Sequence, residues 1–216
     1  MWKIILCGYT GKTGSVLLDY LLEKKDINIV GLVNSTSLPL EETIKLRGSN
    51  VVIDFTTPRS GYYNGVVALN NKNHYICGTT GLTNHQIRHL DDLAREKSLS
   101  VVVCPNFAKG INALLKAIPL FDSIYDYAFI SEHHHITKLD KPSGTALKLK
   151  TKFKNPNIDI NCYRSISPVI FHTLTFYSEY ETVSITHQVN NKRAFCDGVY
   201  EALKHLGQFV GVKNEI

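Results

Sequence analysis

WKIILCGYTGKTG, the stretch from Trp2 to Gly14, decides the fold of the first half of this chain. Its apolar run Trp2–Cys7 predicts a buried strand, and apolar residues at helical spacing in Ser15–Lys24 predict a helix directly after it. Between the two lie glycines at positions 8, 11 and 14, in the pattern G-x-x-G-x-x-G. Glycines at such a turn let the backbone approach a pyrophosphate, which the amides and the dipole of the helix stabilise. The stretch therefore predicts a dinucleotide-binding turn, although a glycine-rich turn without a ligand remains the alternative.

Outward from this turn, short apolar runs alternate with amphipathic stretches. The predicted strands are Ile27–Val33, Val51–Phe55, His74–Cys77 and Leu99–Cys104, and the predicted helices are Gly61–Asn70 and Asn84–Lys97. Strands that alternate with helices at this spacing form a parallel sheet with right-handed crossovers. The predicted fold class is therefore α/β, with a Rossmann-type doubly wound parallel sheet.

The rhythm changes after Pro105, where a smaller α+β unit is predicted. This unit contains helices at Lys109–Phe121 and from Ser143 to about Phe153, a strand at Tyr125–His133, and a strand-rich segment at Asn157–Val189. Within that segment Thr173–Glu179 and Thr182–Val189 are expected to pair antiparallel, which indicates an open mixed sheet.

The last predicted helix, Ala194–Val210, is expected to pack back onto the first domain, because its apolar residues recur at helical spacing. We therefore predict a dinucleotide-binding domain made of residues 1–106 and 193–216. Residues 107–192 form the predicted substrate-binding and oligomerisation domain.

The composition limits the class of protein and its partners. The net charge of +5 comes from 24 basic and 19 acidic residues that are interspersed, so nucleic-acid binding is not indicated and anionic small molecules remain candidate partners. The 5 cysteines lack CxxC spacing and are typical of reduced thiols in a cytoplasmic protein. A strand predicted from residue 2 leaves no room for a signal peptide, and no apolar run reaches the roughly 20 residues of a membrane span.

The end of the second strand bears on the choice of coenzyme. The acidic residue that commonly binds the ribose hydroxyls lies about 20 residues beyond the glycine turn. Here that place holds Asn34, followed by Ser35, Thr36 and Ser37. This neutral patch does not repel a 2′-phosphate as a carboxylate would, so both NADPH and NADH remain open. The alternative is that these residues only cap a loop.

The stretch SEHHHITKLDKPSGTA, from Ser131 to Ala146, combines proton donors with a predicted helix start. A protonated Lys138 supplies charge and a proton, and the amides of Gly144 and Thr145 suit an oxyanion at a helix start. Three histidines also suggest a metal site. Consecutive strand residues point to opposite faces, however, so His133 and His135 share one side and His134 the other. We therefore predict no metal site here.

The same stretch resembles the signature of the 4-hydroxy-tetrahydrodipicolinate reductase (dihydrodipicolinate reductase) family, E-x-H-H-x-x-K-x-D-x-P-S-G-T-A. Other segments resemble that family in the same order along the chain, namely Val52–Pro58, Gly78–Gly81, Pro105–Phe107 and Ile185–His187. The resemblance implies NAD(P)H-dependent reduction of a cyclic dicarboxylate, 4-hydroxy-tetrahydrodipicolinate, to tetrahydrodipicolinate in diaminopimelate and lysine biosynthesis. It also implies a homotetramer assembled through the sheet of the second domain.

Carried over residue by residue, the resemblance assigns His134 as the main acid/base and Lys138 as the proton donor. It implies that the substrate carboxylates are held by His135, Ser143, Gly144 and Thr145. The coenzyme-binding residues that it implies are Gly8, Tyr9, Thr10, Gly11, Lys12, Thr13, Asn34, Phe55, Gly78, Thr79, Thr80, Cys104, Pro105, Asn106 and Phe107.

One departure from the family concerns its R-x-G-x-x-x-G-x-H motif. Arg164 and His172 keep the spacing, but Ile166 and Ile170 stand where glycines are expected. Isoleucine tolerates positive φ poorly, so the loop must be rebuilt if those glycines used it. A catalytically silent NAD(P)-binding regulatory protein is therefore one alternative, and a histidine-dependent metal hydrolase is another.

Overall fold

The computed structural model describes residues 1–215. The chain folds into two compact units, the first comprising Met1–Phe107 and Phe195–Ile216 and the second Ala108–Ala194. The first predicted boundary, after residue 106, lies one residue before the observed one, and the second, after residue 192, lies two residues before it. No helix among the described residues is long and apolar enough to cross a membrane.

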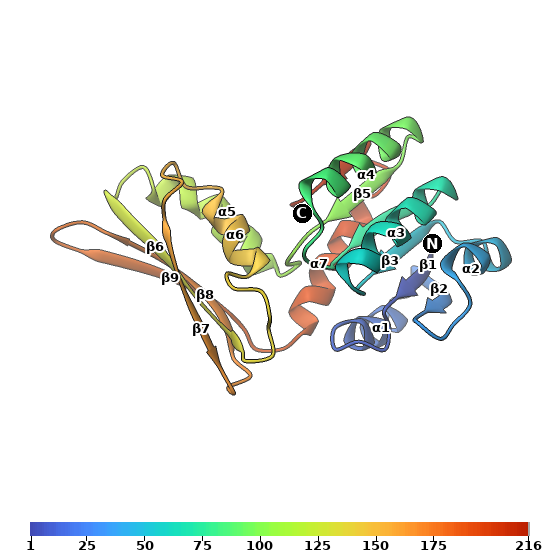
Figure 1. The fold of residues 1–216 in the computed structure, drawn as a ribbon, viewed down its shortest axis with the longest axis horizontal. Helices are drawn as coiled ribbons and strands as arrows, with labels where there is room; N and C mark the ends of the chain where they lie inside the picture. Colours follow the sequence, from blue (N-terminus) through green and yellow to red (C-terminus); the bar gives the residue numbers. More distant parts are fainter. Residues whose placement is uncertain (216) are drawn as a thin grey trace. The chain divides into compact units, whose positions relative to one another are not determined.

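The first unit is built on a parallel sheet of six strands in the order β10-β5-β4-β3-β1-β2 (Figure 1). The strands are β1 (Trp2–Cys7), β2 (Ile27–Val33), β3 (Val51–Asp54), β4 (His74–Cys77), β5 (Ser100–Val103) and β10 (Gly211–Lys213). All residues of the central strand β3 are buried, as its continuous apolar run predicts for a sheet covered on both faces. The predicted Rossmann-type doubly wound sheet is confirmed.

Helices cover both faces of this sheet. They are α1 (Gly14–Leu22), α2 (Leu40–Arg47), α3 (Pro58–Asn70), α4 (Asn84–Glu96) and α7 (Arg193–His205). Buried residues of α1 and α7, such as Leu17 and Val199, share one core with Ile4 and Leu6, which confirms that the last helix packs on the first unit. Residues of α2, α3 and α4 share the other core with Ile5 and Val52.

The C-terminal prediction was wrong beyond His205, where α7 ends. Gly207 has a φ of +82°, a left-handed conformation that does not continue a helix, and β10 follows and pairs parallel with β5. The prediction also missed α2, whose acidic first turn and Gly48 C-cap at φ +65° are ordinary helix signals.

The second unit contains a mixed sheet in the order β7-β6-β8-β9 and two helices (Figure 1). Its elements are α5 (Lys109–Phe121), β6 (Tyr127–His135), α6 (Gly144–Lys150), β7 (Asp159–Ser165), β8 (Ile170–Tyr177) and β9 (Thr182–Val189). β7 runs parallel to β6, whereas β8 is antiparallel to both β6 and β9, so the predicted mixed sheet and antiparallel pair are confirmed. Phe121 and Phe153 stack on Phe176 and cover one face of this sheet.

Candidate active site

His134 lies near the end of β6, on the helix-covered face of the mixed sheet. Along β6 the residues Ile130, Glu132 and His134 are buried, and those between them are not. His133 and His135 therefore point to the other face, as the alternation of a strand predicted. His133 bonds through its two ring nitrogens to Val169 O at 2.7 Å and Ser165 Oγ at 2.8 Å, a structural link to the loop after β7.

The carboxylate of Glu132 is the centre of the buried polar cluster around His134. It is fully buried, and Oε1 accepts hydrogen bonds from the Ser143 amide at 3.0 Å and from Arg164 Nη2 at 2.8 Å. Its Oε2 lies 3.6 Å from His134 Nδ1 and 3.6 Å from His172 Nε2. The sequence analysis did not assign Glu132, although its place two residues before His134 on a strand puts both on one face.

The protonation of this cluster follows from burial and charge. Burial by itself raises the pKa of Glu132, but hydrogen bonds from His172, Ser143 and Arg164 outweigh it and hold the pKa well below its usual value. Burial, first of all, and the charges of the neighbouring His172, Lys138 and Arg164 together lower the pKa of His134 to about 4, against the opposing attraction of Glu132. At neutral pH the free protein therefore holds a neutral His134 beside an ionised Glu132.

His172 joins the cluster from β8, directly opposite Glu132 in the antiparallel pair. Its ring meets that of His134 edge to face, with centroids 5.1 Å apart, and its Nε2 lies 3.3 Å from Ser143 Oγ. Arg164 comes from β7 on the other side of β6, where it pairs with His134 in register. The two ends of the R-x-G-x-x-x-G-x-H motif thus meet at one carboxylate.

The isoleucines within that motif do not disturb it. Among the described residues only Lys72 and Ser98 are non-glycine residues with positive φ, so Ile166 and Ile170 keep ordinary backbone conformations. Ile166 is 84% exposed in the loop after β7, and Ile170 opens β8 opposite Val189. The replacement of these glycines therefore leaves Arg164 and His172 in place.

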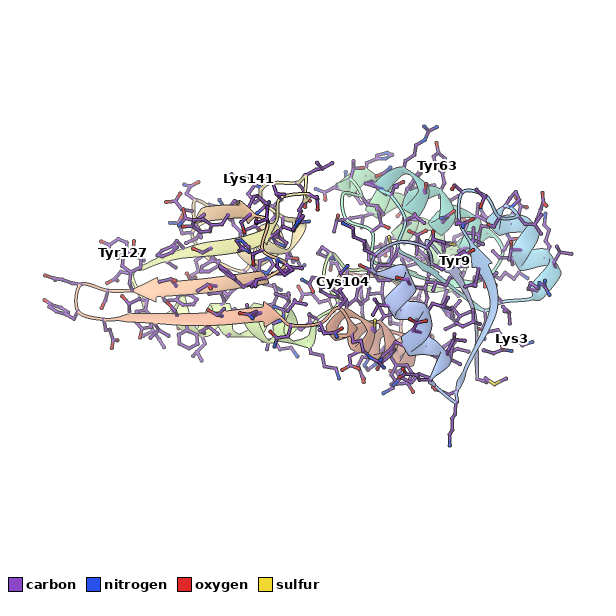
Figure 2. The ribbon with its side chains drawn as sticks, turned by 90° about the horizontal axis from the view of Figure 1, so that it is seen from below. Lys3, Tyr9, Tyr63, Cys104, Tyr127 and Lys141 are labelled. Atoms are coloured by element: carbon purple, nitrogen blue, oxygen red, sulfur yellow. The ribbon has the colours of Figure 1, made fainter. Side chains whose placement is uncertain are left out.

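Lys138 lies in the loop between β6 and α6, which Lys141 marks in Figure 2. Its ammonium group pairs with Asp140 Oδ1 at 2.8 Å, and the side chain is 26% exposed. The Lys138 amide donates to His135 O at 2.9 Å, so the chain turns sharply directly after β6. His135 Nδ1 lies 2.9 Å from Thr137 Oγ1 in the same turn. The predicted residues His135 and Lys138 thus lie in one turn at the end of β6, and the His135 side chain is on the opposite face of β6 from His134.

Ser143, Gly144 and Thr145 form the start of α6, which is seven residues long. Ser143 is its N-cap, and Ser143 Oγ accepts from the Ala146 amide at 3.1 Å. The Gly144 amide already donates to Asp140 Oδ2 at 3.3 Å, and Ser143 and Thr145 are buried. The predicted oxyanion donors therefore lie beside the Glu132 cluster, with part of their hydrogen-bonding capacity used inside the protein.

In the first unit, the glycine turn between β1 and α1 borders a hollow of about 680 Å³. A Cβ on Gly8, at φ +79°, would overlap the carbonyl oxygen of Phe55, and one on Gly14 would overlap that of Gly8. The helix start carries no acidic residue in its first turn and no side-chain cap from Thr13, so its positive dipole end is not neutralised locally. The turn thus fits the pyrophosphate of a dinucleotide.

The hollow is lined by some of the predicted coenzyme residues and by others that were not predicted. The predicted residues in its wall are Gly8, Thr10, Gly11, Asn34 and Phe55. The sequence analysis missed Glu41, Thr57, Ser60 and Asn64, which also line it. Glu41 comes from the start of α2, Thr57 and Ser60 from the start of α3, and Asn64 from the middle of α3. The pattern of a helix following each strand was the signal that could have located them.

Asp54, at the end of β3, joins the loops that follow β3 and β4. This fully buried carboxylate accepts from the Thr56 amide at 3.0 Å and from Thr56 Oγ1 at 2.8 Å. It also accepts from Thr79 Oγ1 at 2.9 Å and from Asn64 Nδ2 at 2.6 Å. The predicted coenzyme residue Thr79 is therefore held by an aspartate that the sequence analysis did not single out.

The other predicted coenzyme residues lie at the same end of the sheet or next to it. Gly78 contacts Phe55 so closely that a Cβ there would overlap the ring, and Phe55 lies against Phe107 with ring centroids 6.0 Å apart. Cys104, Asn106 and Phe107 are buried after β5. Tyr9, Lys12 and Thr13 belong to the glycine turn, and Tyr9 Oη accepts from Asn34 Nδ2 at 3.4 Å.

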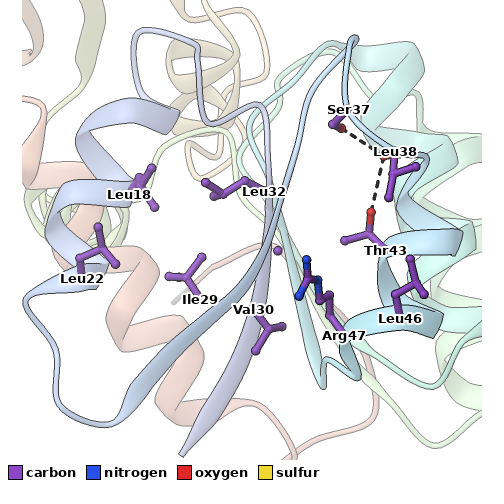
Figure 3. Close-up of a pocket in the computed structure, with 11 residues that line it drawn as sticks. Leu18, Leu22, Ile29, Val30, Leu32, Ser37, Leu38, Thr43, Leu46 and Arg47 are labelled. Atoms are coloured by element: carbon purple, nitrogen blue, oxygen red, sulfur yellow. Dashed lines mark hydrogen bonds between the residues drawn. The ribbon is translucent and has the colours of Figure 1, made fainter.

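A second hollow of the first unit, about 620 Å³, lies beside the edge strand β2. Figure 3 shows Leu18 and Leu22 of α1 on one side of β2 and Leu46 and Arg47 of α2 on the other. None of the predicted site residues lines it.

Glu132, His134 and His172 also have a geometry that a metal ion could use, with ligand atoms within 4.8 Å of one another. This set differs from the three neighbouring histidines considered in the sequence, because it draws on β6 and β8. The carboxylate already accepts from an amide and a guanidinium, and that cation repels a second positive ion. We therefore interpret the set as a hydrogen-bonded cluster.

Comparison with known proteins agrees with this arrangement. A model described as dihydrodipicolinate reductase, N-terminus, matches residues 2–107, and one described as dihydrodipicolinate reductase, C-terminus, matches residues 101–214. The chain is 30% identical to a 4-hydroxy-tetrahydrodipicolinate reductase from Enterococcus faecalis, covering 96% of this chain and 95% of the relative. It is 28% identical to the reductase of that name from Methanococcus aeolicus, covering 95% and 93%.

Among solved structures, a dipicolinate-bound dihydrodipicolinate reductase from Paenisporosarcina sp. TG-14 has the same fold. The TM-score is 0.85 at 23% identity, over 100% of this chain and 98% of that one. An amine dehydrogenase from Mycobacterium smegmatis shares the fold more loosely, with a TM-score of 0.74 at 8% identity over 98% and 94%. With both halves matched in order by the two models, the chain belongs to the dihydrodipicolinate reductase family.

Proposed function

We propose that this protein reduces 4-hydroxy-tetrahydrodipicolinate to tetrahydrodipicolinate with NADH or NADPH, in diaminopimelate and lysine biosynthesis. The overall reaction consumes NAD(P)H and one proton and releases NAD(P)⁺ and water. The observation that carries the proposal is the cluster in the second unit, where a neutral His134 and the Ser143 amide adjoin the buried Glu132 carboxylate. The ammonium group of Lys138 pairs with Asp140 in the loop between β6 and α6. Family membership supports the same reaction.

The first unit supplies the coenzyme site. Gly8 to Thr13 would hold the pyrophosphate at the start of α1, and Asn34 would lie near the adenosine ribose. Phe55, Gly78–Thr80 and Cys104–Phe107 would surround the nicotinamide, which supplies the hydride when bound. The residues present fit this group, because the hollow is of ligand size and its glycine wall carries no acidic side chain in the first turn of α1.

The second unit supplies the substrate site and the proton. His135, Ser143, Gly144 and Thr145 would bind the two carboxylates, and Lys138 would donate a proton to the reduced ring. The neutral His134 of the free protein cannot serve as an acid at pH 7, but a bound dicarboxylate adds negative charge and raises its pKa. His134 would thus accept a proton only when substrate is present, which links acid/base chemistry to binding.

The test is the loss of NAD(P)H absorbance with freshly prepared substrate. His134→Gln and Lys138→Ala should each lower turnover on the order of 10²-fold or more while coenzyme affinity is kept, because each removes an acid/base group. Exposed His85→Gln on α4 is the matched control for the first variant. Coenzyme binding without any substrate-dependent oxidation in the unaltered protein would instead identify a silent nucleotide-binding protein.

We also propose a cytoplasmic homotetramer assembled through the open face of the mixed sheet. Tyr127 and Tyr163 on that face are 59% and 54% exposed, and Tyr177 stacks on Tyr127. Half-exposed aromatic residues on a sheet face are typical of interfaces. All 5 cysteines are free thiols, which suits a reducing compartment.

A further inference from the structure

We propose that Glu132 is a positioning residue: it holds the loop of residues 136–143, and with it Lys138, in a fixed position relative to His134. The proposal rests on the proposed function, since it assigns how the residues of that reaction are kept in place. It adds a residue to the site that the family resemblance did not assign to any role. The argument follows from what each carboxylate oxygen of Glu132 holds.

The first step is that Glu132 joins four segments that are far apart in sequence. It belongs to β6, accepts from the Ser143 amide before α6, accepts from Arg164 on β7, and faces His172 on β8. If a buried carboxylate with this many donors changed its orientation, several of the donors would lose their acceptor. The free-energy cost of a buried unsatisfied donor is larger than the net contribution of one hydrogen bond. The carboxylate therefore sets the relative positions of these segments.

The second step is that the loop is attached to Glu132 at two points. Ser143 bonds to it directly, and Arg164 Nη2 bonds both to Glu132 and, at 2.7 Å, to the carbonyl oxygen of Asp140. Asp140 in turn holds Lys138 Nζ at 2.8 Å and the Gly144 amide at 3.3 Å. The position of the proton donor thus depends on Glu132 through Arg164 and Asp140.

The third step is that the charge of Glu132, not only its shape, is required. The Arg164 side chain is 11% exposed, and a guanidinium so buried needs a counter-charge. A glutamine would keep one acceptor oxygen but leave this cation unpaired. Arg164 would then turn towards solvent and release Asp140, so the loop would lose one of its two attachments.

The direct test is Glu132→Gln, with exposed Glu179→Gln in the turn after β8 as the matched control. We expect the KM for substrate to rise about 10-fold or more, with a smaller fall in kcat, since a broken buried ion pair is costly and the substrate loop is what it holds. The dissociation constant of NADPH, bound in the first unit, should stay unchanged. The variant should also show faster hydrogen exchange in peptides covering residues 136–146.

A second variant keeps the test informative if Glu132→Gln alone folds poorly. In Glu132→Gln/Arg164→Gln no buried charge is left unpaired, so this protein should regain thermal stability while the KM stays high and the loop exchanges fast. Wild-type KM and wild-type loop exchange in either folded variant would overturn the proposal.

The exchange measurement separates this proposal from the proposed reaction. If the unaltered protein fails to oxidise NAD(P)H but the loop still exchanges faster in Glu132→Gln, the positioning role stands and the proposed function fails. If the unaltered protein is active and Glu132→Gln matches it in KM and in exchange, the proposed function stands and the positioning role fails.

Discussion

At the scale of single residues, two buried carboxylates organise the two candidate ligand sites of this protein. Glu132 gathers donors from three other segments of the second unit, and Asp54 gathers Thr56, Thr79 and Asn64 in the first. Neither residue would touch the reacting atoms, yet each holds residues that we assign to ligand binding. A buried polar group is costly unless its hydrogen-bond partners are in place, so these two residues make site geometry and folding depend on each other.

Asn34 tests the choice of coenzyme. Its Oδ1 accepts from the Thr36 amide and from Thr36 Oγ1, both at 3.0 Å, and an aspartate keeps that acceptor. Asn34→Asp should therefore fold normally but repel a 2′-phosphate, lowering kcat/KM about 10-fold for NADPH and not for NADH, equal to about 1.4 kcal/mol. Steady-state kinetics with both coenzymes measures this, with Asn28→Asp on the exposed side of β2 as control. Equal values for NADPH before and after the change would place the 2′-phosphate elsewhere.

His134 makes a prediction about stability and pH. Its pKa of about 4 in the folded protein lies below the ordinary value of 6.5, so folding disfavours its protonated form. The stability tied to the neutral ring is complete above about pH 6.5 and is lost as the pH falls towards 4. The unfolding free energy should thus drop more between pH 7 and pH 4.5 in the unaltered protein than in His134→Gln. Urea titrations at several pH values check this, and parallel curves for the two proteins would contradict it.

At the scale of elements, the candidate coenzyme site lies at the ends of the strands of the first unit. The loops after β1, β2, β3 and β4 meet at the carboxyl edge of the parallel sheet, where the hollow of the first unit lies. In the second unit the candidate site is built differently, because its side chains come from three adjacent strands, with His172 opposite Glu132 and Arg164 opposite His134. One unit therefore presents backbone and loops to its ligand, and the other presents side chains from the face of a sheet.

Asp54→Asn tests the link between β3 and the loop after β4. The new amide group would present a donor to either Asn64 Nδ2 or the Thr56 and Thr79 donors, leaving a buried mismatch. We expect a loss of about 2 kcal/mol in unfolding free energy and a weaker NADPH affinity, while the hydrogen exchange of β6, which carries Glu132 in the second unit, is unchanged. Chemical denaturation, titration calorimetry and hydrogen exchange measure these quantities, with exposed Asp92→Asn as control. Unchanged coenzyme affinity would show that this link does not shape the coenzyme site.

At the scale of the whole molecule, the mixed sheet has one face covered by helices and one without them. Phe176 and Leu174 point to the covered face and are fully buried. On the other face Thr173 and Thr186 join neighbouring strands by a hydroxyl hydrogen bond of 2.9 Å. A sheet with aromatic and hydroxyl residues on an open face is suited to pair with other copies of itself.

Thr173→Arg tests the proposed tetramer. Thr173 lies on the central strand β8, so an arginine there would place a charge within an interface formed by this face. We expect light scattering coupled to size exclusion to show a tetramer for the unaltered protein and smaller species for the variant. Thr151→Arg, exposed after α6, should remain a tetramer. A tetramer that persists in Thr173→Arg would move the interface to another surface.

The amino-acid sequence by itself determined the family, strands β1 to β5 of the parallel sheet, and the helices of the first unit other than α2. Apolar periodicity and glycine spacing act between near neighbours in the chain, so Trp2–Cys7 and Gly8–Gly14 predicted β1 and the turn after it directly. Strand alternation likewise predicted that His134 would face away from His133 and His135. The predictions that failed concern short segments, namely the helix α2 and the end of α7 at His205. In such short segments only a few residues carry the pattern.

Only the tertiary structure decided which side chains meet across strands. Glu132 lies 32 residues from Arg164 and 40 from His172, and their meeting depends on β6 lying between β7 and β8 in one register. Asp54 likewise contacts Thr79 only because β3 and β4 are neighbours in the sheet. A shift of a single residue in either strand pairing would turn these carboxylates to the opposite face. Register is set by packing of the whole sheet, so no local pattern in the sequence could have placed these contacts.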